Sequence, residues 1–219
     1  MSKIPEIDLI TKYKRVGINF EDKYIEGNFV KTKEALERIQ KIENFLEADI
    51  PIVFKGDTGT SKTKSVEVYC CIKKMNKFIR FNLSSETTIE DLMGRLLSSG
   101  ESWSGFKFVP VPFIEAYENG CILLLDELNL VQKNIIQSIQ YGIDSKVLYI
   151  EVNGKMLKYK KSKDFRIICT QNPKSGGFVS IREDLSEFLQ RFQVIYFDRF
   201  LAQELNNIAL LIHKKKTNI

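Results

Sequence analysis

The stretch GDTGTSKT at residues 56–63 constrains the fold most, because it follows a short apolar run, PIVFK, at residues 51–55. Glycines at 56 and 59 let successive backbone N–H groups turn inward around phosphate oxygens, and a helix starting behind the loop adds a favourable dipole. The phosphate-loop pattern has a glycine before the lysine, whereas this chain has Ser61. A strand before and a helix after are the context that the motif requires, so we predict a phosphate-binding loop rather than a chance match.

Three residues at the end of this loop have a predicted part in the site. Lys62 would neutralise the β- and γ-phosphates, and the Thr63 hydroxyl would hold Mg²⁺, so ATP and Mg²⁺ are the expected ligands. Ser61 is expected to take right-handed dihedrals at the start of the helix, where a small side chain is tolerated and a hydroxyl is favourable. The predicted phosphate-binding set is Gly56, Asp57, Thr58, Gly59, Thr60, Ser61, Lys62 and Thr63.

Strands that alternate with helices predict an α/β fold. Short apolar runs indicate buried strands at 51–55, 78–84, 121–127, 165–173 and 194–198. Helical spacing predicts helices at 31–48, 63–75, 88–99, 112–120, 134–145 and 199–215, with a loop at 98–105. Period-two alternation around Asn153-Gly154 predicts a β-hairpin. This order favours a three-layer α/β/α sandwich of the P-loop NTPase type, with a mostly parallel sheet and the hairpin inserted before the strand at 165–173.

Two further polar clusters, DELN and TQNP, follow predicted strands. Ligands bind beyond the carboxyl ends of parallel strands, so both clusters are expected to share one site with the loop. Burying two adjacent acids costs several kcal/mol unless they meet a cation. Asp126 is therefore a candidate Mg²⁺ ligand, Glu127 is a candidate for polarising the attacking water, and Asn172 would orient that water. The alternatives are acids that complement a helix dipole, and an ordinary Asn-Pro turn.

Two arginines are candidates for a catalytic role in a neighbouring site. Arg191 lies between a predicted helix and a predicted strand in LSEFLQRFQVIYF, and Arg182 lies shortly before it. Either could be a surface residue or an arginine finger that reaches a neighbour's γ-phosphate. Composition does not decide between them.

Composition excludes several classes. The formal charge of +5, from 33 basic and 28 acidic residues, does not predict direct nucleic-acid binding. The four cysteines fall in apolar segments without metal-ligand spacing, which indicates buried free thiols in a reducing compartment. The charged N-terminus is no secretory signal, and the aliphatic run at 121–130 breaks at acids, so no membrane segment is expected. The predicted location is the cytoplasm or nucleus.

Together the motifs resemble the AAA+ ATPases of the midasin/dynein/MoxR branch, and midasin-like modules most closely. The resemblance is carried by GDTGTSKT, RFNLSSETTIEDLMGRL, PFIEAYENGCILLLDELNL, FRIICTQNP and LSEFLQRF. It implies that residues 56–63 are the Walker A loop, that Asp126 and Glu127 are the Walker B acids, that Asn172 is sensor 1, and that Arg191 is a finger acting in trans. It also implies neighbouring AAA+ modules in a ring, in cis or in trans, that remodel a protein or ribonucleoprotein client.

The resemblance divides the chain into an N-terminal extension (1–30), an AAA+ large subdomain (31–200) and the start of a helical lid (201–219). A full lid does not fit in these last residues, so we expect a piece of a longer protein or a truncated lid. The leading hypothesis is an ATPase, weak as an isolated chain, since Glu127 has no use in a site that only binds. The alternatives are a degenerate nucleotide-binding or structural module with little hydrolysis, and a nucleic-acid motor.

Overall fold

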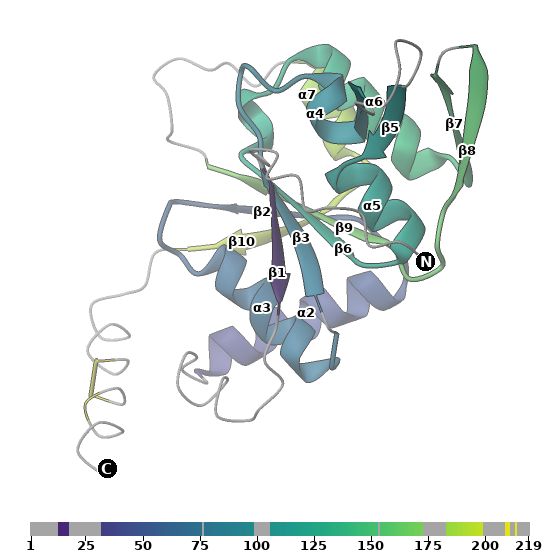
Figure 1. Ribbon diagram of the computed structural model, residues 1–219. Helices are drawn as coiled ribbons and strands as arrows, with labels where there is room; N and C mark the ends of the chain where they lie inside the picture. The colour runs from purple at the N-terminus through teal and green to yellow at the C-terminus, as the bar shows by residue number, and fades with distance from the viewer. Residues whose placement is uncertain are drawn as a thin grey trace.

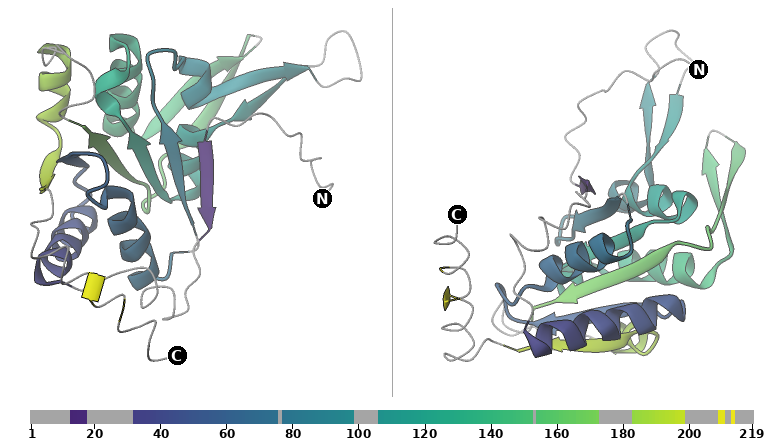
Figure 2. Two further views of the ribbon diagram at one scale, coloured as in Figure 1. Left: turned by 90° about the vertical axis from the view of Figure 1, so that its left-hand side faces the viewer. Right: turned by 90° about the horizontal axis from the view of Figure 1, so that it is seen from below.

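The computed structural model of this chain describes residues 13–17, 32–75, 77–98, 106–152, 154–172 and 183–198, with residues 209, 210 and 213 near the C-terminus. Helices cover both faces of a six-stranded sheet (Figures 1 and 2). Each face contributes to its own buried apolar cluster, so the sheet lies between two cores. The predicted three-layer α/β/α fold with a mostly parallel sheet is confirmed.

Five strands of the central sheet are parallel. In spatial order the sheet contains β1 (Tyr13–Gly17), β3 (Lys77–Asn82), β6 (Ile122–Asp126), β9 (Arg166–Gln171), β2 (Ile52–Gly56) and β10 (Gln193–Phe197). All neighbours pair in parallel except β1, which pairs antiparallel with β3 at one edge. Strands buried on both faces read as continuous apolar runs, which is why β6 is ILLLD with every residue buried. Sequence reasoning found the five parallel strands and missed β1.

The helices divide between the two faces of the sheet. Helices α2 (Lys33–Glu47) and α3 (Lys62–Ile72) pack on one face, and α5 (Pro112–Asn119), α6 (Lys133–Asp144) and α7 (Glu183–Leu189) cover the other (Figure 2). Local chemistry sets their ends. The Thr32 hydroxyl accepts a hydrogen bond from the Ala35 N–H at the start of α2, and α5 ends at Gly120 with φ 71°.

The prediction of a helix at 88–99 is mostly wrong. Only α4 (Ile89–Met93) forms, and Thr88 and Asp91 close its capping box. The chain then enters β4 (Gly94–Ser98), which pairs antiparallel with β5 (Phe106–Pro110). Gly94 has φ 156°, and a Cβ there would lie 2.1 Å from the Phe108 ring, so a contact distant in sequence overrides the local helical spacing. Residues 99–105 of the predicted loop lie outside the described residues.

The predicted β-hairpin is confirmed. Strands β7 (Val147–Val152) and β8 (Lys155–Lys160) pair antiparallel and project from the body of the fold (Figure 1). Asn153, Arg182 and most of the helix predicted at 199–215 lie outside the described residues. The domain boundaries at residues 30 and 200 therefore stay predictions.

The four cysteines are buried free thiols, as their apolar surroundings predict. Burial raises the pKa of the Cys70 and Cys169 thiols well above the ordinary range, which leaves them protonated at neutral pH. Among the described residues, no helix is long and apolar enough to cross a membrane.

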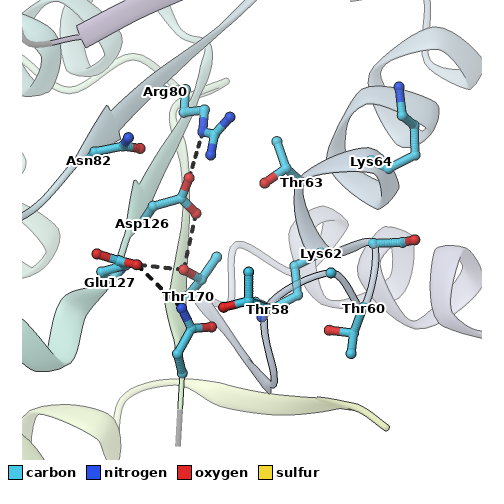
Figure 3. Close-up of a pocket in the computed structure, with 13 residues that line it drawn as sticks. Thr58, Thr60, Lys62, Thr63, Lys64, Arg80, Asn82, Asp126, Glu127 and Thr170 are labelled. Carbon is cyan, nitrogen blue, oxygen red and sulfur yellow. Dashed lines mark hydrogen bonds and ion pairs between the residues drawn. The ribbon is translucent and has the colours of Figure 1, made fainter. Parts of the chain in front are cut away.

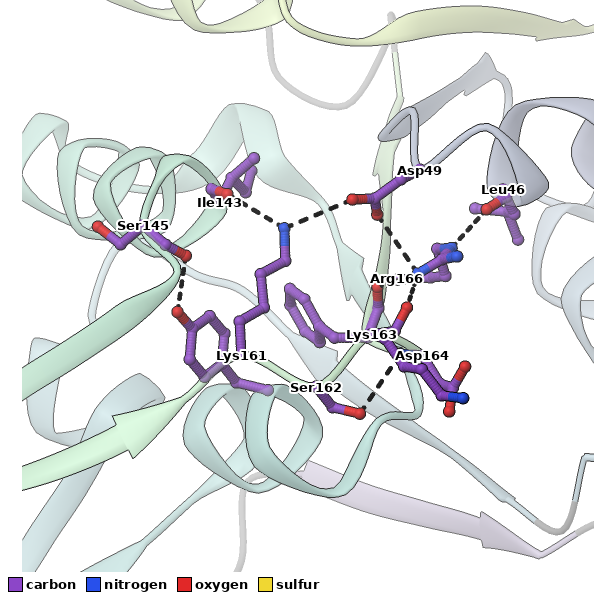
Figure 4. A network of polar contacts seen from close by, with 11 residues as sticks. Leu46, Asp49, Ile143, Ser145, Lys161, Ser162, Lys163, Asp164 and Arg166 are labelled. Atoms are coloured by element: carbon purple, nitrogen blue, oxygen red, sulfur yellow. Dashed lines mark hydrogen bonds and ion pairs between the residues drawn. The ribbon is translucent and has the colours of Figure 1, made fainter.

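The start of β9 is held by a partly buried arginine. The Arg166 guanidinium donates to the carbonyl oxygen of Leu46 at the end of α2, and to the carbonyl oxygens of Lys163 and Phe165 at 2.8 Å each (Figure 4). Its Nη1 lies 3.3 Å from Oδ1 of Asp49. A cation at a helix C-terminus stabilises the negative end of the dipole, so Arg166 joins α2 to the central strand.

A second cation joins the same segment to the opposite helical layer. Lys161 Nζ donates to the carbonyl oxygen of Ile143 in the last turn of α6 at 3.2 Å and lies 3.9 Å from Asp49 Oδ2 (Figure 4). The Ser162 N–H donates to the carbonyl oxygen of Tyr117 in α5 at 2.8 Å. The link between the hairpin and β9 is thus fastened to three helices.

We predict that Arg166→Met lowers the free energy of unfolding by about 2 kcal/mol, because charge-assisted hydrogen bonds to half-buried carbonyls are lost. Lys163→Met is the matched control, since Lys163 is exposed in the same segment and should change stability by less than about 0.5 kcal/mol. Urea unfolding followed by circular dichroism measures both values. Equal stabilities for the two variants would contradict the anchoring role.

Candidate functional site

One pocket of about 420 Å³ lies at the carboxyl ends of β2, β6 and β9, within the size range of ligand sites. All three polar clusters singled out in the sequence contribute to it, as the parallel order of the strands leads one to expect (Figure 3). The lining residues are Thr58, Gly59, Thr60, Ser61, Lys62, Thr63, Lys64, Arg80, Asn82, Asp126, Glu127, Thr170 and Asn172.

The loop between β2 and α3 has its shape set by two glycines. A Cβ on Gly56 would lie 2.2 Å from the carbonyl oxygen of Phe197 in β10, so the close approach of these strands excludes any side chain. Gly59 has φ 83°, which favours glycine on conformational grounds. The Thr60 hydroxyl donates to the carbonyl oxygen of Asp57 at 2.8 Å and closes the loop on itself.

Lys62 is the cation at the centre of the loop. Its Nζ lies 2.7 Å from the carbonyl oxygens of both Gly56 and Asp57, and the residue is only 8% exposed. Burial lowers the pKa of Lys62, while the nearby acids, Asp126 first among them, partly oppose that shift. The ammonium group is thus held in place by two neutral acceptors, which phosphate oxygens can replace.

Ser61 does not adopt the expected conformation. It has φ 67° and ψ 23°, in the left-handed region, and its side chain makes no capping hydrogen bond. The expectation of right-handed dihedrals was wrong because the loop reverses direction at this residue before entering α3. Glycine is favoured at such a position since a left-handed L-residue costs about 1–2 kcal/mol. The site therefore contains a strained serine where the motif has glycine.

Asp126 at the end of β6 is a buried carboxylate with both oxygens bonded. Oδ2 accepts from Arg80 Nε at 2.6 Å, and Oδ1 accepts from the Thr170 hydroxyl at 3.0 Å (Figure 3). The same Thr170 oxygen accepts from the Glu127 backbone N–H at 3.1 Å, so one threonine of β9 contacts the Asp126 carboxylate and the Glu127 backbone. Sequence reasoning gave Arg80 and Thr170 no role. The available signal was a polar residue inside an otherwise apolar strand.

Glu127 and Asn172 lie side by side at this edge of the sheet. Asn172 Nδ2 is 3.4 Å from Glu127 Oε1. Glu127 has φ 64°, a left-handed conformation at the turn from β6 into a short 3₁₀ helix (Leu128–Leu130). Backbone strain of this kind is common at functional sites. An acid and an amide are thus available together at one wall of the pocket.

The donor set fits a magnesium-bound triphosphate. Among the described residues, no group of three or more His, Cys, Asp or Glu side chains could hold a metal alone. Mg²⁺ does not require such a group, because it is usually bound by one or two carboxylates together with substrate phosphates and water. The Thr63 hydroxyl points toward Asp126 across the pocket (Figure 3), so two oxygen donors that could serve a metal face the same space.

Arg191 does not line the pocket. It follows α7, and its Nε lies 3.4 Å from Asp144 Oδ2 at the end of α6, with side chains 38% and 50% exposed. The structure therefore leaves this guanidinium accessible on the surface of the chain. Arg182, the other candidate, lies outside the described residues.

Sequence comparison connects this geometry to known proteins. Residues 51–192 match the family described as AAA domain (dynein-related subfamily). Midasin from Giardia intestinalis is 32% identical over 165 residues, which are 75% of this chain and 3% of that protein. Midasin from Dictyostelium discoideum is 28% identical over 94% of this chain and 4% of its own length. Protein CbbQ from Hydrogenophilus thermoluteolus is 29% identical, covering 74% of this chain and 58% of CbbQ. The chain thus spans a small part of each midasin.

A solved structure shares the fold. A candidate ATPase from Cytophaga hutchinsonii superposes with a TM-score of 0.58 over 85% of this chain and 55% of its own, at 19% sequence identity.

Relief of the strain at position 61 should be measurable. We expect Ser61→Gly to unfold with a free energy about 1 kcal/mol higher than Ser61→Ala, because glycine takes the left-handed conformation without a Cβ clash. This is a net value: the left-handed conformation costs alanine about 1–2 kcal/mol, and the larger freedom of glycine in the unfolded chain offsets about 0.4–1 kcal/mol of that cost. Urea unfolding of both variants and the wild type tests this. A glycine variant less stable than the alanine variant would rule out strain at this residue.

Proposed function

Because the chain belongs to the dynein-related subfamily of AAA domains, we propose that it binds ATP with Mg²⁺ in the pocket at the strand ends and hydrolyses it. This membership confirms the resemblance found in the sequence. The observation that carries the proposal is the meeting of Lys62, Asp126, Glu127 and Asn172 in one pocket, although they come from three separate strand ends. A chance match to the loop motif would not bring acids and an amide to the same place.

Each residue of the site has its own proposed role, which follows from its chemistry. Backbone N–H groups of the loop and Lys62 bind the phosphates. Thr63 and Asp126 would hold Mg²⁺, which when bound neutralises charge on the phosphate oxygens. Glu127 polarises the attacking water, and Asn172, bonded to Glu127, orients the same water. Thr170 keeps the two acids in their relative positions.

The larger role that we propose is remodelling of a macromolecular assembly within a ring of AAA+ modules, in cis or in trans. Arg191 would complete a neighbour's site, which its exposure outside its own pocket supports. The client would be a protein or a ribonucleoprotein. The buried free thiols suit a reducing compartment, so the cytoplasm or nucleus remains our prediction.

A binding module with little hydrolysis is the second candidate. The strained Ser61 favours it, because a loop held in an unfavourable conformation can misplace the γ-phosphate for attack while the nucleotide stays bound. Glu127 and its partner Asn172 favour hydrolysis, since a site that only binds has no use for a group that polarises water.

Two substitutions separate binding from hydrolysis. We expect Lys62→Ala to weaken ATP binding about 100-fold, through loss of a charge-assisted contact. Glu127→Gln should keep binding but lower hydrolysis at least about 100-fold. Calorimetric titration with Mg-ATP and phosphate release give the two readouts, and Lys41→Ala on the exposed face of α2 is the control. Wild-type protein that binds ATP without releasing phosphate, at any protein concentration, would favour the binding module.

A finger acting in trans predicts complementation. Arg191→Ala and Lys62→Ala should each lack activity alone, because one loses the finger and the other loses nucleotide binding. A one-to-one mixture should regain phosphate release, since a mixed interface can combine an intact pocket with an intact arginine. The measurement is phosphate release against protein concentration. Activity of Arg191→Ala equal to the wild type, or a mixture as inactive as its components, would exclude Arg191 from this role.

A further inference from the structure

Arg80 is paired with an oxygen of Asp126, the residue that we propose as a metal ligand. Its Nε lies 2.6 Å from Asp126 Oδ2, and Figure 3 shows its guanidinium next to the Asp126 carboxylate at the wall of the pocket. We propose that Arg80 is a built-in cation that competes with the divalent metal for Asp126, and so makes metal binding depend on displacement of this arginine. The inference rests on the proposed role of Asp126 as metal ligand.

The competition follows from the charges on Asp126. Its side chain is 9% exposed, so the carboxylate needs a compensating cation. One of its oxygens is bonded to the Thr170 hydroxyl, and the other faces Arg80. A metal ion that shares an oxygen with the guanidinium would meet a like charge within a few ångströms, which is unfavourable in a partly buried site. Arg80 and the metal therefore stabilise the same carboxylate at each other's expense.

The Arg80 side chain is placed so that it can move away from Asp126. It extends from β3, the neighbour of β6, and its side chain is 36% exposed on the wall of the pocket. Thr170 can keep its hydrogen bond to Asp126 Oδ1 when the arginine leaves. The guanidinium can move toward solvent or toward an anion in the pocket without unfolding its strand. Replacing Arg80 by a metal ion thus requires only the Arg80 side chain to move away from Asp126 Oδ2.

A second arginine–aspartate pair in the chain provides a matched comparison. Arg95 pairs with Asp91, and their side chains are 38% and 2% exposed, close to the values for Arg80 and Asp126. Asp91, however, also accepts from the Thr88 N–H in the capping box of α4, and neither residue lines the pocket. The two pairs therefore differ in that Asp91 is part of a helix cap, and in that only Arg80 and Asp126 line the pocket.

Mn²⁺ alone tests the proposal, since it accepts the same oxygen ligands as Mg²⁺ and its free ion is measured directly by electron paramagnetic resonance. We expect Arg80→Gln to bind one Mn²⁺ about tenfold more tightly than the wild type, a coupling of ordinary size. Arg80→Gln combined with Asp126→Asn should lose the gain. Arg95→Gln should bind Mn²⁺ as the wild type does. Circular dichroism verifies that each variant is folded.

Arg80→Lys keeps the charge and provides a second variant should Arg80→Gln fail to fold. It should bind Mn²⁺ as weakly as the wild type, and binding as tight as that expected of Arg80→Gln would overturn the proposal. Equal affinities for Arg80→Gln and the wild type would also overturn it, as would a gain that survives Asp126→Asn. No nucleotide is present in this titration, so a chain that binds no ATP would still reveal the competition.

Discussion

The register of β9 between β2 and β6 is the constraint on which the rest of the site depends. Cys169 pairs with Val53 on one side and with Leu125 on the other, so the three strands end at the same level. That alignment brings the loop at residues 56–63, the acids Asp126 and Glu127, and the Asn172 amide to one edge of the sheet. A slip of one residue would turn Thr170 to the opposite face of the sheet and remove the hydrogen bonds that orient both acids.

Charge balance within the chain explains how the charged side chains of the site can be buried. The cation of Lys62 is satisfied by two carbonyl oxygens of its own loop, and the anion of Asp126 by Arg80 and Thr170. Neither group needs a ligand in order to be buried. A ligand therefore exchanges partners that already exist, which costs less than ordering an unformed site.

The parts of the fold that could be predicted are those with a local signal. Continuous apolar runs revealed the parallel strands, and the loop motif with its flanking elements revealed where the pocket lies. The misses come from contacts distant in sequence. Pairing with β5 gives a strand after Gly94 where local spacing favours a helix. Ser61 is left-handed because the loop turns there, and Arg80 acquires its role only when β3 lies beside β6.

The hairpin of β7 and β8 has a mechanical consequence for the pocket. Residues 161–165, which connect it to β9, are bonded to α5 and α6, and Arg166 at the start of β9 is bonded to the end of α2. The six residues of β9 then lead to Thr170 and to Asn172 just beyond. Force applied to the hairpin tip is therefore borne by a central strand and three helices rather than absorbed by a slack loop. The root of the projecting ribbon therefore lies one strand length from the pocket.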